Sequence, residues 1–115
     1  MKKIEAIIRQ EKLEDIKEAI QQKFDEQPTG MTVSQVLGFG HQKGMKDYVR
    51  GQAVIPAFVS KVMISFLVED QQVDPICQLI VDICQTGIVG DGKIFIYPVE
   101  EAIRIRTGER GAAAI

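Results

Sequence analysis

The order in which apolar periodicities follow one another is the strongest constraint that this chain places on its fold. Apolar side chains that alternate or fill short runs predict four strands, over residues 3–9, 31–39, 58–68 and 94–99. Apolar side chains three or four residues apart predict two helices, one over 12–24 and one that begins at Asp70 or Asp74 and ends before Gly87. The predicted order is therefore strand, helix, strand, strand, helix, strand.

A strand–helix–strand unit that occurs twice in one chain favours an α+β fold with a single sheet. Crossover connections within one sheet are right-handed, and the two units together form the split βαβ, or ferredoxin-like βαββαβ, sandwich. With 115 residues the chain has enough material for one core, so residues 1–115 are expected to form a single domain. Both helices should then cover the same face of an antiparallel sheet.

The strand expected over 58–68 is apolar on both of its faces. Its segment 62–68 reads VMISFLV, so apolar side chains occur at odd and even positions alike. Two helices can cover only one face of the sheet, and an uncovered apolar face is typical of an interaction surface. The sequence therefore favours an oligomer whose subunits pack sheet against sheet.

A long connector, residues 40–57, separates the second and third predicted strands. It has no clean apolar period and contains three glycines and one proline. Hairpin loops usually need two to five residues, and connectors beyond about 12–15 are uncommon unless they are functional or disordered. Polar and basic residues are concentrated at its base, which favours a working loop over a passive one.

Composition argues against several classes of function. The formal net charge is −2, so no basic face for nucleic acid phosphates is expected. No apolar run approaches the length needed to cross a bilayer, and the N-terminal segment lacks the apolar stretch of a signal peptide, which together predict a cytoplasmic protein that is not membrane-embedded. Cys77 and Cys84 are one heptad apart on one predicted helix, too far for a disulfide, and are expected to be small buried hydrophobes.

The segment 87–93 (GIVGDGK) has the spacing of a phosphate-binding P-loop but not its context. A P-loop follows a strand and opens a helix, whereas this segment follows a helix and opens a strand, and Ile94 stands where Ser or Thr would hold magnesium. Closely spaced glycines still let backbone N–H groups approach an anion, and Lys93 adds a point charge beside them. From this segment alone, an anion site and a tight helix-to-strand turn are equally supported.

Two arginines near the C-terminus support the anion site. Arg104 and Arg106 alternate with Ile103 and Ile105, so an extended backbone would place both guanidinium groups on one side. Paired guanidinium groups suit a polyphosphate because each offers rigid, bidentate donor geometry. A solvated surface strand is the alternative interpretation of the same residues.

In combination, these motifs resemble those of the PII nitrogen-regulatory signal-transduction family. The matching segments are Gly30-Met31-Thr32, Gly38-Phe39-Gly40 with Gln42-Lys43-Gly44, Thr86-Gly87 with Gly90-Asp91-Gly92-Lys93, and Arg104-Ile105-Arg106-Thr107-Gly108-Glu109. The resemblance implies a homotrimer of ferredoxin-like subunits that binds ATP and ADP in three clefts between neighbours. It also implies that loop 40–57 docks on a regulated transporter, channel or metabolic enzyme, and that a transporter partner would recruit the protein to a membrane.

The resemblance also implies the residues of each site. Those expected to bind the nucleotide are Thr32, Gly38, Gly40, His41, Gln42, Leu67, Gly90, Asp91, Gly92, Lys93, Arg104 and Arg106, with Thr32 and the backbone near Leu67 at the adenine. Gln42 would also hold Mg²⁺ with ATP and, together with Lys61, would bind 2-oxoglutarate. Partner docking is expected to involve Met45, Tyr48, Arg50 and Val54.

Several functional positions depart from the family pattern. His41 stands where most relatives carry a phosphate-contacting arginine, Ser65 replaces an acidic residue near the adenine, and Val54 replaces a tyrosine that some relatives modify. These departures leave open the partner, the preference between ATP and ADP, 2-oxoglutarate sensing and any covalent modification of the loop.

Two other classes of protein remain as alternatives to a non-enzymatic switch. One is a nucleotide-hydrolysing or phosphotransfer enzyme on the same fold, for which His41 is the one candidate phosphohistidine. The other is a structural trimer similar to CutA, which would leave Lys93, Arg104 and Arg106 without a role. No catalytic residue stands out, so the leading interpretation allows at most weak incidental ATP hydrolysis.

Overall fold

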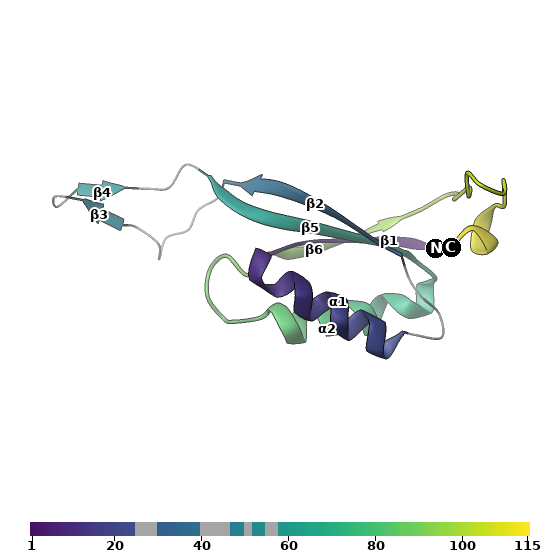
Figure 1. Ribbon diagram of the computed structural model, residues 1–115, viewed down its shortest axis with the longest axis horizontal. Helices are drawn as coiled ribbons and strands as arrows, with labels where there is room; N and C mark the ends of the chain where they lie inside the picture. Colours follow the sequence, from purple (N-terminus) through teal and green to yellow (C-terminus); the bar gives the residue numbers. More distant parts are fainter. Residues whose placement is uncertain (25–29, 40–46, 50–51, 55–57) are drawn as a thin grey trace.

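A computed structural model of the protein describes residues 1–24, 30–39, 47–49, 52–54 and 58–115 (Figure 1). The main sheet has four strands, β1 (Lys2–Ile8), β2 (Met31–Gly38), β5 (Val59–Val68) and β6 (Lys93–Pro98). Two helices, α1 (Leu13–Lys23) and α2 (Val73–Cys84), each follow a short 3-10 turn, η1 (Gln10–Lys12) and η2 (Asp70–Gln72). The order of these elements is the one predicted from the apolar periodicities.

The four strands run antiparallel to their neighbours in the order β2-β5-β1-β6. Strand β1 lies inside the sheet, because Ile4 is opposite Phe66 of β5 on one side and Ile96 of β6 on the other. Strands β2 and β6 are therefore the two edges of the sheet. This topology, with both helices on one side, confirms the predicted α+β ferredoxin-like fold.

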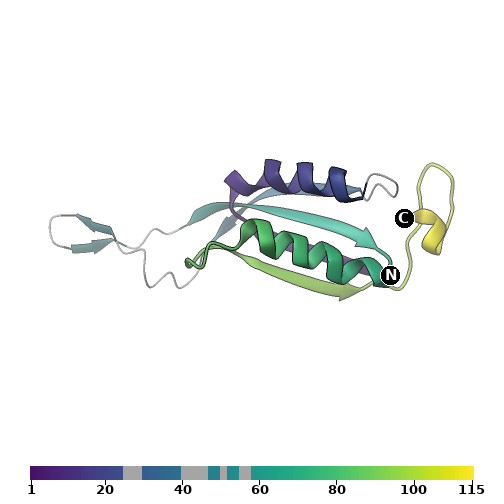
Figure 2. The same cartoon turned by 90° about the horizontal axis from the view of Figure 1, so that it is seen from below.

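The core lies between the sheet and the two helices. Alternate residues of β1 face the helices, and Ile4 and Ala6 are completely buried. The helices contribute buried side chains at helical spacing, such as Ile16 and Ile20 of α1 and Ile76 of α2. Figure 2 shows the two helices side by side on this face of the sheet. Full burial of such side chains contributes about 1.5–3 kcal/mol each.

The opposite face of the sheet carries no helix (Figure 1). The residues that alternate with the buried ones point to this side, and several are apolar, among them Ile7, Met63, Leu67, Phe95 and Tyr97. Phe95 is 40% exposed and Tyr97 is 44% exposed. The prediction that one apolar face of the sheet stays uncovered within the chain is therefore confirmed.

The connector between β2 and β5 contains a short hairpin that the sequence did not predict. Strand β3 (Asp47–Val49) pairs with β4 (Gln52–Val54) in a separate two-stranded sheet, and strands this short give too little periodicity to be recognised. At the base of the connector, the rings of Phe39 and Phe58 lie 5.6 Å apart between centroids. Both rings are largely exposed.

The start of the second helix differs from the prediction. Neither Asp70 nor Asp74 begins it; Glu69 precedes the 3-10 turn, and its N–H donates to the side-chain oxygen of Gln72 over 3.1 Å. Asp70 instead accepts a hydrogen bond from the ammonium group of Met1 over 2.6 Å. Among the described residues, the one hydrogen bond of the Asp70 side chain is this bond to Met1, so it does not cap the helix.

The C-terminal segment forms a tight turn, so the extended backbone that would place Arg104 and Arg106 on one side does not form. The N–H of Gly108 donates to the carbonyl of Arg104 over 2.7 Å, and Ile103 forms an isolated bridge with Arg110. Gly108 has a φ of 73°, a conformation that glycine adopts without strain. These local backbone bonds override the strand-like alternation of Ile and Arg, and the 3-10 turn η3 (Gly111–Ala114) follows.

Helix α2 carries both cysteines as free thiols. Cys84 is buried, as predicted, whereas Cys77 is only partly buried; burial raises the pKa of each thiol. Among the described residues, no helix combines the length and the apolar character needed to cross a membrane.

Candidate functional site

A glycine-rich loop between α2 and β6 contains the GDGK motif. Gly87, Gly90 and Gly92 have positive φ values of 81°, 105° and 105°. A Cβ atom on Gly92 would lie 1.7 Å from the carbonyl oxygen of Ile7 in β1, so only glycine fits at this contact. The loop is therefore held against the sheet at the point where Lys93 begins β6.

The carboxylate of Asp91 organises this loop from within. Its oxygens accept hydrogen bonds from the N–H of Thr86 over 2.7 Å, from the N–H of Gly87 over 2.9 Å and from the Thr86 hydroxyl. These bonds, led by the one from the Thr86 side chain, lower the pKa of Asp91 from 3.8 to about 2. The resemblance implies that Asp91 lies at the nucleotide; in the structure its carboxylate faces the amides of its own loop.

Two cationic side chains contact the same loop. The Nη2 atom of Arg9 donates to the Val89 carbonyl over 3.0 Å, and its Nε lies 3.4 Å from an Asp91 oxygen. Lys61 of β5 donates to the Gly90 carbonyl and is only 6% exposed. Burial, together with the nearby charge of Arg9, lowers the pKa of Lys61. We refer to Arg9 and Lys61 as the cationic cluster.

Arg9 is a site residue that sequence reasoning missed. Ile8 is opposite Val62 in the sheet, so the next position along the two strands brings Arg9 alongside Lys61. The register that creates this neighbour relation joins segments far apart in the chain, and it cannot be read from either segment alone. The available signal was a charged residue directly after a strand whose end is apolar.

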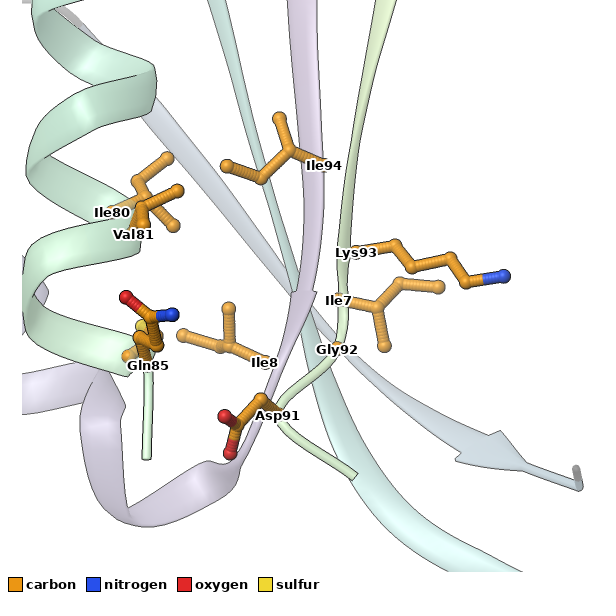
Figure 3. Close-up of a pocket in the computed structure, with 10 residues that line it drawn as sticks. Ile7, Ile8, Ile80, Val81, Gln85, Asp91, Gly92, Lys93 and Ile94 are labelled. Atoms are coloured by element: carbon orange, nitrogen blue, oxygen red, sulfur yellow. The ribbon is translucent and has the colours of Figure 1, made fainter. Parts of the chain in front are cut away.

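A cavity of about 400 Å³ opens beside the loop, between α2 and β6 (Figure 3). Its lining is mainly apolar and includes Ile8, Ile80 and Ile94. In Figure 3 the side chain of Lys93 points away from Ile80 and Val81. An apolar cavity does not suit phosphate groups, and the one lysine in its lining points away from it.

A second hollow, of about 410 Å³, lies toward the opposite end of the sheet. Thr32 and Leu67, the residues expected to contact adenine, both line it, together with Lys3. Leu67 is opposite Lys3 of β1, whereas Lys93 is opposite Ile7, so about 13 Å of strand separates the two positions within one chain.

The C-terminal arginines lie beyond the end of β6, away from the glycine-rich loop (Figure 1). The Nη1 atom of Arg104 lies 3.1 Å from a carboxylate oxygen of Glu109. The side chain of Arg106 is exposed. The residues predicted to contact phosphate therefore form two groups within one chain, with Lys93 and the loop at one end and the arginines at the other.

Other predicted residues lie wholly or partly outside the described residues. Those without a description are Gly40, His41, Gln42, Met45 and Arg50. Tyr48 belongs to β3 and Val54 to β4, for which the strand pairing is given. Gly38 ends β2 opposite Val59, and a Cβ there would lie 3.6 Å from Cγ of Lys61, so Gly38 adjoins the cationic cluster.

Comparison with known proteins identifies the family to which this sequence belongs. A family model described as nitrogen regulatory protein P-II matches residues 1–109. Proteins named nitrogen regulatory protein P-II align with 115 residues, which is 100% of this chain and 100% of each relative: 50% identical from Pasteurella multocida (strain Pm70), 49% from Rhodospirillum rubrum and 47% from Microchaete diplosiphon. The chain therefore belongs to the P-II family of nitrogen regulatory signalling proteins.

Proposed function

We propose that three copies of this chain assemble into a ring that binds ATP and ADP in the clefts between neighbours. The bound nucleotide would set the conformation in which the connector 40–57 meets a partner protein. The observation that supports this is the separation of the predicted phosphate contacts: Lys93 and the loop lie at one end of a subunit, and Arg104 and Arg106 at the other. A triphosphate could meet both groups only where two subunits adjoin.

The uncovered face of the sheet gives the copies a physical reason to associate. Removing apolar area from water stabilises association by about 25 cal/mol per Å², and copies of one chain usually close into symmetric assemblies. With these faces turned inward, the edge strand β6 of one copy would approach the edge strand β2 of the next. Lys93 of one copy would then face Thr32 of its neighbour.

In such a cleft, the hollow at Thr32 and Leu67 of one copy would lie next to the glycine-rich loop of its neighbour. The adenine would occupy the hollow at Thr32 and Leu67 of one copy, and Arg104 and Arg106 of that copy would reach the phosphates. Backbone amides of the glycine-rich loop and Lys93 would come from the other copy. Charge-assisted hydrogen bonds contribute about 1.5–3 kcal/mol each, so three or four cations suffice for roughly micromolar affinity.

A second ligand is proposed for the cationic cluster. A carboxylate of 2-oxoglutarate would replace the Gly90 carbonyl as the partner of Lys61, and Gln42 would join it while holding Mg²⁺ beside the ATP phosphates. We expect 2-oxoglutarate to bind in calorimetry only when Mg-ATP is present. Lys61→Met should abolish that binding and leave ATP affinity within about threefold; 2-oxoglutarate binding that survives this substitution would contradict the assignment.

The output of the switch would be conformational, with no catalytic step. A ligand can shift an equilibrium only by its difference in affinity for the two states, so ATP and ADP must favour different arrangements of the connector. The regulated partner would be a transporter, a channel or a metabolic enzyme. We place Met45, Tyr48, Arg50 and Val54 at the surface it contacts.

Mixed oligomers offer the sharpest test of a site shared between copies. Lys93→Ala and Arg106→Ala homo-oligomers should each bind ATP at least tenfold more weakly than the wild type in isothermal titration. When the two chains are unfolded together and refolded at equal amounts, about a quarter of the clefts should receive an intact Lys93 from one chain and an intact Arg106 from the other, and should regain wild-type affinity.

The control is the same two proteins mixed without unfolding, for which no recovery is expected. A site built within one subunit cannot be rescued in this way, so lack of recovery after refolding would overturn the shared site. A chain that is monomeric at micromolar concentration, or that binds neither ATP nor ADP at millimolar nucleotide, would end the proposal altogether.

A further inference from the structure

The two C-terminal arginines, which look equivalent in the sequence, differ in what holds them. Arg104 forms an ion pair with Glu109, with 3.1 Å between Nη1 and Oε1, and its Nη2 donates to the main-chain oxygen of Ile115 over 3.3 Å. Arg106 is exposed and forms no ion pair with any residue that the structure describes. An incoming anion would therefore find one arginine free and the other already occupied by a carboxylate.

Glu109 also closes the turn that carries both arginines. Its carbonyl accepts the N–H of Arg104 over 2.9 Å, and its own N–H donates to the Thr107 hydroxyl over 3.2 Å. The N–H of Gly108 donates to the Arg104 carbonyl over 2.7 Å. Because the ion pair and the backbone bonds join the same two residues, Arg104 cannot swing outward without leaving the Glu109 carboxylate.

We infer that Glu109 is an internal competitor of the nucleotide: its carboxylate holds Arg104 while no anion is bound and opposes the polyphosphate that takes its place. The inference rests on the proposed nucleotide site and adds a regulatory residue to it. Glu109 acts through Arg104, so it is a positioning residue and need not touch the nucleotide.

The sign of this effect does not depend on how the phosphate approaches Arg104. If the phosphate takes the Nη atoms, it must displace the Glu109 carboxylate and the main-chain oxygen of Ile115. If it takes the edge that includes Nε, the carboxylate remains beside it as a second negative charge on the same guanidinium. Either way, the charge of Glu109 lowers the affinity for polyphosphate.

Displacement of Glu109 from Arg104 would also weaken the contact of Arg104 with the last residue of the chain. Arg104 is bonded to Ile115 as well as to Glu109, so an outward movement of its guanidinium releases the residue that follows η3. If the phosphate takes the Nη atoms, its binding should therefore loosen the last residues of the chain while it orders the arginines.

The test is Glu109→Gln, which keeps the side-chain shape and removes the charge. Calorimetric titration at low salt with ATP, and separately with inorganic tripolyphosphate, should show about twofold to fivefold tighter binding, the range expected for a half-exposed ion pair. Glu109→Asp, which keeps the charge, should restore most of the wild-type affinity. Without any ligand, amide hydrogen exchange at Gly108 should be faster in Glu109→Gln than in the wild type.

The matched control is Glu101→Gln, in the same segment and with the same change in net charge. Glu101 lies 3.8 Å from Arg110 and makes no ion pair with Arg104 among the described residues, so its substitution should leave the affinity nearly unchanged. Unchanged or weaker binding in Glu109→Gln would overturn the inference, as would equal tightening in both variants.

The two proposals can fail separately. If the wild type binds ATP and Glu109→Gln binds it equally well, the competition between Glu109 and the nucleotide is disproved, but the nucleotide site is not. If the wild type binds neither probe at millimolar concentration, the nucleotide site falls, and exchange at Gly108 then decides the role of Glu109 in the turn. Faster exchange than in Glu101→Gln supports that role, and an unchanged rate overturns it.

Discussion

Two carboxylates, Asp91 and Glu109, lie toward opposite ends of the main sheet, and of the two only the Asp91 carboxylate accepts backbone N–H groups of described residues in addition to side-chain partners. Asp91 accepts hydrogen bonds from the backbone N–H groups of Thr86 and Gly87, which belong to its own loop. Glu109 pairs with the side chain of Arg104 at the surface. Backbone donors cannot rotate away, whereas exposed ion pairs exchange at little cost. The glycine-rich loop is therefore preformed, and the C-terminal turn is able to change partners.

The largest effect that this comparison predicts is at Gly92. An alanine there would bring Cβ to 1.7 Å from the Ile7 carbonyl oxygen at a φ of 105°, so the pairing of β1 with β6 would have to shift. We expect the free energy of unfolding to fall by at least about 3 kcal/mol in denaturant titration. Gly30→Ala, which meets nothing within 4 Å, is the control. Equal stability of the two variants would show that the loop is not held against the sheet.

The next largest effect is expected for Asp91→Asn. An amide cannot accept the same set of bonds from Thr86 and Gly87, so the loop should lose its preformed shape and ATP affinity should fall at least tenfold. Asp82→Asn, on the exposed side of α2, is the control, because Asp82 bonds only to Gln78 among the described residues. Wild-type affinity in Asp91→Asn would mean that the loop needs no internal carboxylate.

The contribution of the Asp91 carboxylate to stability should also depend on pH in the wild-type protein. The pKa of Asp91 in the folded chain, about 2, lies below its ordinary value of 3.8. Its contribution to stability is therefore complete above about pH 4 and is lost as the pH falls toward 2. The difference in unfolding free energy between wild type and Asp91→Asn should be constant from pH 7 to pH 5 and should shrink below pH 4. A difference that persists at pH 2 would argue against a charged Asp91.

The smallest effect is expected in the C-terminal turn. Gly108 has a φ of 73°, but a Cβ there would meet nothing within 4 Å. Gly108→Ala should therefore cost only the backbone strain of a left-handed residue, about 1–2 kcal/mol locally, and less in global unfolding if the turn opens first. A loss as large as that of Gly92→Ala would show that the turn is as firmly held as the loop.

Most of the fold was predictable because apolar periodicity is a local property of the sequence. The alternation in 3–9 and the helical spacing in 12–24 each specify an element without reference to the rest of the chain. The uncovered face was predictable because segment 62–68 (VMISFLV) is apolar on both faces, whereas two helices can cover only one face of a sheet. The β3–β4 hairpin was missed because its strands of three residues are too short to show a period.

The candidate site was less predictable because its contacts depend on register and on local backbone bonds. Arg9 joins Lys61 only through the pairing of β1 with β5. Arg104 and Arg106 follow a strand-like alternation, but Gly108 turns the backbone back on itself, and Thr107-Gly108 was the signal for that turn. The partner of the Asp91 carboxylate could not be read from its motif, since a ligand and a loop amide are equally suitable donors.

The contact between Phe39 and Phe58 has a consequence for how such a protein could diversify. Gly38 and Val59 are already paired in the sheet, so the two ends of the enclosed segment meet whatever its length. Doubling a loop whose ends are fixed costs only about 0.6 kcal/mol of closure entropy. Insertions, deletions or a transplanted segment between the two rings should leave the melting temperature of the sheet nearly unchanged, and binding specificity could then evolve without rebuilding the scaffold.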